Sequence, residues 1–109
     1  MTSVTEMDNE PSNSKIKDII IKIKNKKLDE ASVSIDELLT NFPNSSLLYS
    51  LRGTIELSKS NYDKAIKCFL KAKENNPNRK EVYFDLGTAY ELKIEYEAAA
   101  ENFLKVLEI

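Results

Sequence analysis

The chain has 109 residues, of which 41% are hydrophobic and 31% charged, and its formal net charge is −2. It contains no histidine and one cysteine, Cys68, which excludes histidine-dependent catalytic triads, metal sites built on histidine or several cysteines, and an internal disulfide. We therefore expect no enzyme, no cofactor and no metal. Because no apolar run approaches the roughly 18 residues of a membrane span and no secretory signal is evident, we expect a cytoplasmic protein.

Residues 1–14 form an acidic start without hydrophobic periodicity. The segment carries a charge of −3 from Glu6, Asp8 and Glu10, and it contains Pro11. Low hydrophobicity and charge of one sign are typical of segments that do not fold. The sequence therefore predicts a disordered leader over residues 1–14.

The next segment, residues 15–27, is rich in lysine and places isoleucines at helical spacing. Ile16, Ile19, Ile20 and Ile23 form one apolar stripe, which a membrane surface could bind, while the lysines could contact nucleic acid. A helix that packs this stripe against its neighbours explains the pattern better, since no aromatic residues are interleaved for base stacking. We therefore expect neither a nucleic-acid nor a membrane partner.

The middle of the chain is predicted to form two helices, at residues 46–58 and 62–75. In the second, Ala65 and Phe69 belong to a stripe that recurs at helical spacing. Pro77 follows this helix, and proline cannot continue the backbone hydrogen bonds of a helix. The segment therefore reads as a helix, a short break, a second helix and a turn.

The same plan recurs along the chain with one fixed spacing, which we call the repeat period. The pairs that share this spacing are Gly53/Gly87, Pro43/Pro77, Tyr49/Tyr83, Tyr62/Tyr96, Ala65/Ala99 and Phe69/Phe103. A fixed period in residues that set helix packing is typical of a stacked helical repeat. It predicts an all-α array of about six helices over residues 12–109, in three repeats at 12–45, 46–79 and 80–109, the last incomplete. The first repeat has Ile19 instead of glycine, so its helices are expected to pack less closely.

These residues resemble the tetratricopeptide repeat, a helix–turn–helix unit of about 34 residues with glycine, alanine and aromatic residues at set positions. The resemblance is carried by Tyr49, Gly53, Ala65, Phe69, Ala72 and Pro77 in the second repeat, and by Tyr83, Leu86, Gly87, Tyr90, Ala99 and Phe103 in the third. It implies a right-handed superhelical stack in which these residues pack the repeats together, with glycine and alanine where paired helices cross. Arg52 and Glu56 depart from the pattern, which prefers apolar or aromatic residues there.

The resemblance also implies a protein-interaction module with a concave groove, lined mostly by the first helix of each repeat, that binds a peptide or helix of a partner. The candidate groove residues are Ile20, Leu47, Ser50, Leu51, Thr54, Ser58, Glu81, Phe84, Asp85, Thr88 and Glu91. Relatives that bind the carboxyl-terminal tails of chaperones clamp the carboxylate with basic and amide residues, whereas this chain has Leu51, Glu81 and Asp85. Acids repel a carboxylate, so chaperone tails are disfavoured and a basic, partly apolar partner is expected.

The end of the third repeat is expected to expose apolar residues, in some combination of Ala100, Leu104, Leu107 and Ile109. Repeat arrays usually need a polar cap over such a face. Either the chain is the amino-terminal part of a longer protein, which we favour, or self-association buries the face. The alternative function is accordingly an oligomerisation, scaffold or accessory segment of a larger protein, for example ahead of a bacterial transferase domain.

Overall fold

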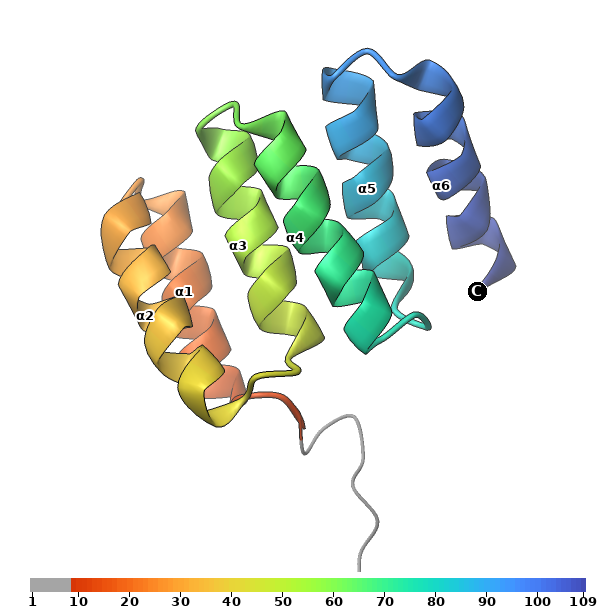
Figure 1. Ribbon diagram of the computed structural model, residues 1–109. Helices are drawn as coiled ribbons and strands as arrows, with labels where there is room; N and C mark the ends of the chain where they lie inside the picture. The colour runs from red at the N-terminus through yellow and green to blue at the C-terminus, as the bar shows by residue number, and fades with distance from the viewer. Residues whose placement is uncertain (1–8) are drawn as a thin grey trace, which may run out of the picture.

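The protein consists of helices and their connecting turns over residues 9–109, the part of the chain that a computed structural model describes (Figure 1). The predicted bounds 46–58 and 62–75 are those of α3 and α4. The all-α repeat array expected from the sequence is confirmed. The helices are α1 (Asn13–Lys24), α2 (Leu28–Asn41), α3 (Ser46–Ser58), α4 (Tyr62–Asn75), α5 (Lys80–Leu92) and α6 (Tyr96–Glu108).

The helices pack as three consecutive hairpins, α1–α2, α3–α4 and α5–α6 (Figure 1). Each helix contacts the next one in the chain, and α3 also approaches both α1 and α5. Among the described helices, no comparable approach joins α2 to α4 or α4 to α6. The odd-numbered helices therefore lie on the inner side of a curved array and the even-numbered helices on its outer side. The array is only 18 Å thick along its shortest axis, which is the depth of two helix layers.

Two apolar clusters hold the hairpins together. The first joins α1 and α2 to α3 through buried residues such as Ile19, Ile35 and Leu48. The second joins α4 to α5 through residues that include Phe69 and Leu86. Burying one large apolar side chain contributes about 1.5–3 kcal/mol, and each cluster includes side chains from two neighbouring hairpins. The stability of each repeat therefore depends on its neighbour.

The first hairpin is looser than the other two, as the sequence predicts. The backbones of α1 and α2 approach each other along less of their length than those of α3 and α4 or of α5 and α6. Ile19 stands in the register of the two glycines and is fully buried in the first cluster. A side chain of this size at the contact keeps paired helices farther apart.

The two glycines give space to aromatic rings. A Cβ atom on Gly53 would lie 2.4 Å from Cε1 of Phe69, and one on Gly87 would lie 2.5 Å from Cε1 of Phe103. These distances are far below van der Waals contact, so only glycine leaves room for the ring. The expected close approach of paired helices at the glycines is confirmed for α3 with α4 and for α5 with α6; what the sequence did not predict is that the ring of the second helix lies against the glycine of its own repeat.

The turn inside each hairpin has the same backbone conformation in all three repeats. Lys26, Ser60 and Ile94, which follow one another at the repeat period, have φ angles of 63°, 62° and 66°. This left-handed conformation is unfavourable for residues with a Cβ and most of all for a β-branched residue. The Ile94 side chain is nevertheless 71% exposed. Burial of this side chain therefore does not compensate for the unfavourable φ angle of its backbone.

The segment ahead of α1 is tied to the second repeat by Glu10. Its carboxylate accepts hydrogen bonds from Ser45 Oγ, from the Ser46 N–H (2.9 Å) and from the Leu47 N–H (3.3 Å). Ser45 also accepts one from the Leu48 N–H at 3.0 Å. Glu10 therefore satisfies free amides at the amino terminus of α3, where the helix dipole favours a negative charge.

This contact corrects the predicted leader. The disorder expected over residues 1–14 is wrong for residues 9–14, because Glu10 is held by α3, Pro11 is buried and α1 begins at Asn13. The remaining residues, 1–8, lie outside the described part of the chain.

Replacing each glycine by alanine should lower the free energy of unfolding by different amounts at the two positions. Gly→Ala in a helix ordinarily stabilises by about 1 kcal/mol, but Gly53→Ala places its Cβ within the Phe69 ring, which is 1% exposed and enclosed by the second cluster. We expect Gly53→Ala to lower the free energy of unfolding by about 1–3 kcal/mol. Gly87→Ala should cost less, because Phe103 is half-buried at the end of the array and can move. Denaturant unfolding of both variants measures the difference, and an equal loss would contradict it.

Removing the Glu10 carboxylate should destabilise the second repeat, although Glu10 lies ahead of the first repeat in the sequence. We expect Glu10→Ala to lower the free energy of unfolding by about 1 kcal/mol, the usual contribution of a side chain that caps a helix. Glu10→Gln should lose less, because one acceptor oxygen remains. Thermal unfolding provides the measurement, with Glu37→Gln on the exposed side of α2 as the control; equal melting temperatures for Glu10→Ala and the control would contradict the role of Glu10.

Candidate partner-binding surface

The candidate groove residues lie on the three odd-numbered helices and combine apolar with acidic side chains. We use the name inner face for those that solvent reaches. Ile20, Ser58, Glu81, Phe84 and Glu91 are exposed, and Leu47, Leu51, Thr54, Asp85 and Thr88 are half-buried. Leu47 and Leu51 pack at the edge of the first cluster, so that part of the inner face is rigidly supported.

Ser50 does not belong to the inner face, which corrects one predicted groove residue. It is 6% exposed, and its hydroxyl accepts a hydrogen bond from Arg79 Nη1 at 3.3 Å. The same Arg79 nitrogen donates to Ser46 Oγ at 2.8 Å, and this hydroxyl in turn donates to the Ala72 carbonyl at 2.8 Å. Arg79 thereby links α3, α4 and the start of α5. The motif did not reveal this network, because its serines and arginine occupy positions that the repeat leaves variable.

Asp85 is the unusual group of the inner face. Its side chain is half-buried, and no described residue forms a hydrogen bond or ion pair with it. Burial raises the pKa of the Asp85 carboxyl to about 6; nearby Arg79 lowers this pKa and nearby Glu81 raises it. The carboxylate thus loses hydration without gaining an ion pair, and the charge of Arg79 offsets only part of this loss; such an arrangement occurs at binding sites more than on ordinary surfaces.

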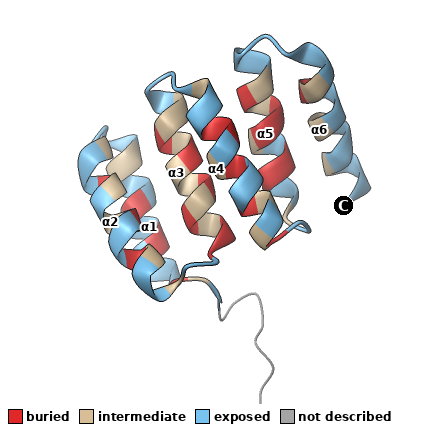
Figure 2. Ribbon diagram, viewed as in Figure 1, coloured by how far each residue is buried: buried red, intermediate tan, exposed pale blue. Residues whose placement is uncertain are grey.

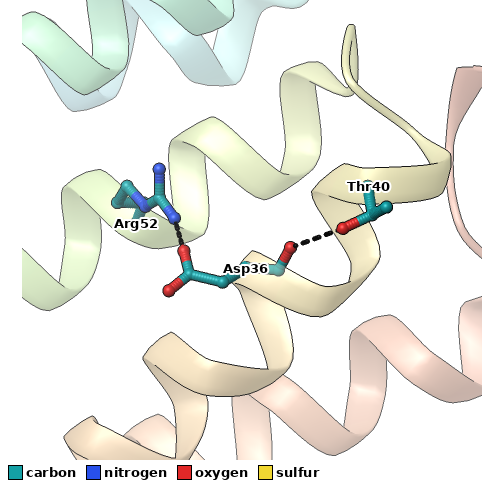
Figure 3. Close-up of polar contacts among 3 residues, drawn as sticks. All are labelled: Asp36, Thr40 and Arg52. Carbon is teal, nitrogen blue, oxygen red and sulfur yellow. Dashed lines mark hydrogen bonds and ion pairs between the residues drawn. The ribbon is translucent and has the colours of Figure 1, made fainter.

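The two departures from the repeat pattern are explained by polar contacts on α3. Arg52 forms an ion pair with Asp36 of α2, and the Thr40 hydroxyl donates to the Asp36 carbonyl at 3.4 Å (Figure 3). Glu56 accepts a hydrogen bond from Asn61 Nδ2 at 3.1 Å, across the turn that leads to α4. The contact between the first and second repeats is therefore partly ionic.

Nothing in the described residues indicates a reactive centre. No three side chains that could ligate a metal ion come together in residues 9–109. Cys68 is half-buried, and burial raises the pKa of its thiol, which disfavours the nucleophilic thiolate. None of the six described helices is both long enough and apolar enough to cross a membrane.

Most of α6 is coloured as exposed in Figure 2, and several of its exposed residues are apolar. Leu107 is 81% exposed, Leu104 63% and Ile109 42%, and Ala100 is exposed as well. All four residues named from the sequence thus reach solvent. Ala99, which precedes Ala100 and lies on another side of α6, is only 4% exposed.

The sequence of the repeat array matches the profile of a known protein family. The profile of the Iml2/Tetratricopeptide repeat protein 39 family matches residues 5–109, nearly the whole chain. The chain belongs to this family. Membership of the Iml2/Tetratricopeptide repeat protein 39 family agrees with the glycine–phenylalanine contacts described above and confirms the tetratricopeptide resemblance. Such repeats serve in protein–protein interaction or as scaffolds.

One curated relative extends the comparison. The chain is 27% identical to Superkiller complex protein 3 of Homo sapiens over 110 residues, which cover 96% of this chain and 7% of that protein. The chain therefore spans only a small part of this relative's length. The relative is named for a protein complex, and this agrees with the interaction role of the Iml2/Tetratricopeptide repeat protein 39 family.

The Asp85 carboxyl should make stability depend on pH in an unusual direction. Because its folded pKa is about 6 rather than 3.8, the folded state binds more protons than the unfolded state between these values. Its contribution to stability therefore falls as pH rises from about 4 to about 6 and stays low above that. After allowance for solvent screening, Asp85→Asn should stabilise the protein by about 1–2 kcal/mol at neutral pH and by almost nothing near pH 4.

Denaturant unfolding across this pH range, for the wild type and Asp85→Asn, measures the difference. Glu91→Asn is the matched control, since Glu91 is an exposed acid on the same helix. A constant difference between wild type and Asp85→Asn over the whole range would contradict the assignment.

Proposed function

We propose that this chain is a non-catalytic protein-interaction module that binds a basic, partly apolar peptide or helix of a partner protein along its inner face. The observation that carries the proposal is the half-buried Asp85 carboxyl, whose pKa stays raised although Arg79 is nearby, and with which no described residue forms a hydrogen bond or ion pair. A lysine or arginine from a partner would supply a direct contact of opposite charge, and such charge-assisted contacts are stronger than neutral ones.

The surroundings of Asp85 support a basic partner. Glu81 and Glu91 on the same helix are exposed acids, and residues 80–109 carry a net charge of −4, from three lysines against seven aspartates and glutamates. A surface of one sign steers partners of the opposite sign toward itself. A carboxylate-terminated chaperone tail would be repelled here.

Apolar side chains on the same face support a partner that is also partly apolar. Phe84 is 57% exposed, and its ring lies against Phe103 with centroids 5.8 Å apart. Ile20 is 38% exposed on α1. Exposed aromatic anchors beside acidic groups suit a peptide that alternates apolar and basic residues. The absence of histidine from the sequence supports a role without catalysis, and we place this role in the cytoplasm.

A second candidate function is that of a scaffold or accessory segment within a larger assembly. It is favoured by the similarity to Superkiller complex protein 3, of which the chain matches only 7%. In that case the exposed side of α6, rather than the inner face, would contact another component of the same assembly.

Selection from a library of peptides of about 12 residues tests the inner face. We expect the wild type to enrich peptides with lysine or arginine next to apolar residues, and their affinity to rise as pH increases through about 6, because the cation favours the ionised Asp85. Asp85→Lys and Glu81→Lys should each weaken binding about tenfold or more. Glu37→Lys on α2, outside the inner face, is the control. Basic peptides that bind all four proteins equally would overturn the proposal.

A further inference from the structure

Leu92, the last residue of α5, extends the inner face beyond the residues that the sequence predicted. Its counterpart one repeat period earlier is Ser58, which belongs to the inner face. Leu92 follows Asp85 by seven residues and Thr88 by four, a spacing that places the three side chains on one side of the helix. Its side chain is 47% exposed. Because Glu81 and Asp85 precede it, the inner side of α5 is acidic at its start and apolar at its end.

A second exposed apolar side chain, Ile94, follows in the turn between α5 and α6 (Figure 1). Its φ angle of 66° is unfavourable for a β-branched residue, and glycine is the usual choice for this conformation. The matching turns of the other repeats have the polar residues Lys26 and Ser60 there. Strained residues that persist in a fold are concentrated at binding and catalytic sites. The strain and the exposure together point to a binding role for the Ile94 side chain.

The exposure of these two positions does not depend on where the array ends. The third repeat packs on the second, and yet Ser58 and Ser60, the counterparts of Leu92 and Ile94, are exposed. Lys24 and Lys26 are likewise exposed in the first repeat, although the second repeat packs on it. A neighbouring repeat therefore leaves both positions accessible to solvent. Of the three described repeats, the third alone places apolar side chains there.

The turn that carries Ile94 is held in place by its neighbours. The Nζ atom of Lys93 lies 2.7 Å from a carboxylate oxygen of Asp63 and 3.2 Å from one of Glu95. The Ile94 N–H donates to the Glu91 carbonyl at 2.9 Å. Because these contacts fix the turn against α4 and α5, a partner that binds Ile94 does not have to order it first.

We propose that Leu92 and Ile94 form an apolar anchor site at the end of the inner face, and that this site selects a partner helix with an apolar residue seven positions away from a lysine or arginine. The inference rests on the proposed function, since the cation pairs with Asp85. Asp85 and Leu92 are separated by about 10.5 Å along the helix axis, and a helix lying beside α5 has the same spacing. In an extended strand, three residues span about this distance, but their side chains point to opposite faces.

The charges of the two helices favour an antiparallel arrangement. The basic residues of the partner face Glu81 and Asp85 in the first half of α5. Cations are most stable near the carboxyl terminus of their own helix, which an antiparallel partner brings to the amino-terminal end of α5. The partner is therefore expected to have an apolar residue, then a basic residue seven positions later, and a second basic residue four positions after that.

Two alanine-based helical peptides of about 20 residues test this spacing. The matched probe has leucines about eleven and seven residues before its first lysine, and a second lysine about four residues after it. The shifted probe has the same composition, but both leucines are moved by about two positions to the far side of the helix. We expect the full chain to bind the matched probe with a dissociation constant of about 10–100 μM in fluorescence anisotropy, and the shifted probe about fivefold more weakly or less.

Substitutions at the two apolar residues test the anchor site. Leu92→Ser should weaken binding of the matched probe about fivefold or more and leave the shifted probe unchanged. Val33→Ser is the matched control, since Val33 is 55% exposed on α2, and it should change neither affinity. Ile94→Gly should raise the melting temperature by about 4 °C or more, because glycine adopts this φ angle without strain, and yet weaken the matched probe about threefold or more. A residue with only a structural role would not lose binding while the protein gains stability.

Asp85→Lys distinguishes failure of this inference from failure of the proposed function. It should weaken both probes, because both carry the lysines. If Asp85→Lys weakens binding but Leu92→Ser and the shifted spacing do not, the anchor site is overturned and the proposed function stands. If neither probe binds at millimolar concentration, or Asp85→Lys leaves both affinities unchanged, both proposals are overturned. Equal affinity of Ile94→Gly and the wild type for the matched probe would overturn the role of Ile94.

Discussion

The structure depends on the contact between an aromatic ring on the second helix of a repeat and a glycine on the first. Gly53 admits the ring of Phe69, which also belongs to the apolar cluster with α5. One side chain therefore packs inside its own hairpin and against the next repeat. Because close-packed interiors tolerate little change in volume, this single contact sets both the closeness of α3 to α4 and the position of α5.

Repetition of this contact gives most positions in the array a counterpart one repeat period away, and some counterparts differ in charge. Leu51 packs at the edge of the first cluster, whereas its counterpart Asp85 is an unpaired carboxyl with a raised pKa. Asp63 is paired with Lys93, whereas no basic residue lines the hollow around its counterpart Glu97. The second and third repeats therefore share a scaffold but differ in the charges placed on it.

Several features of the fold could be predicted because they follow from local sequence. The bounds of α3 and α4, the looser first hairpin and the exposed side of α6 depend on spacing and side-chain size, which the chain shows directly. Other features could not be predicted, because they join residues far apart in sequence. Glu10 binds the start of α3, and Arg79 covers Ser50 and so removes it from the inner face.

The amino-acid sequence by itself determined the repeat, its period and the helices that compose it, since glycine, alanine and phenylalanine at a fixed spacing admit one way of packing. Tertiary structure alone decided which polar groups have partners. The partners of Ser50, Arg52 and Glu10 are side chains or amides that the fold brings near them from other segments of the chain. Sequence spacing records which residues share a helix face, but the electrostatic environment of a group is set by distances across the fold.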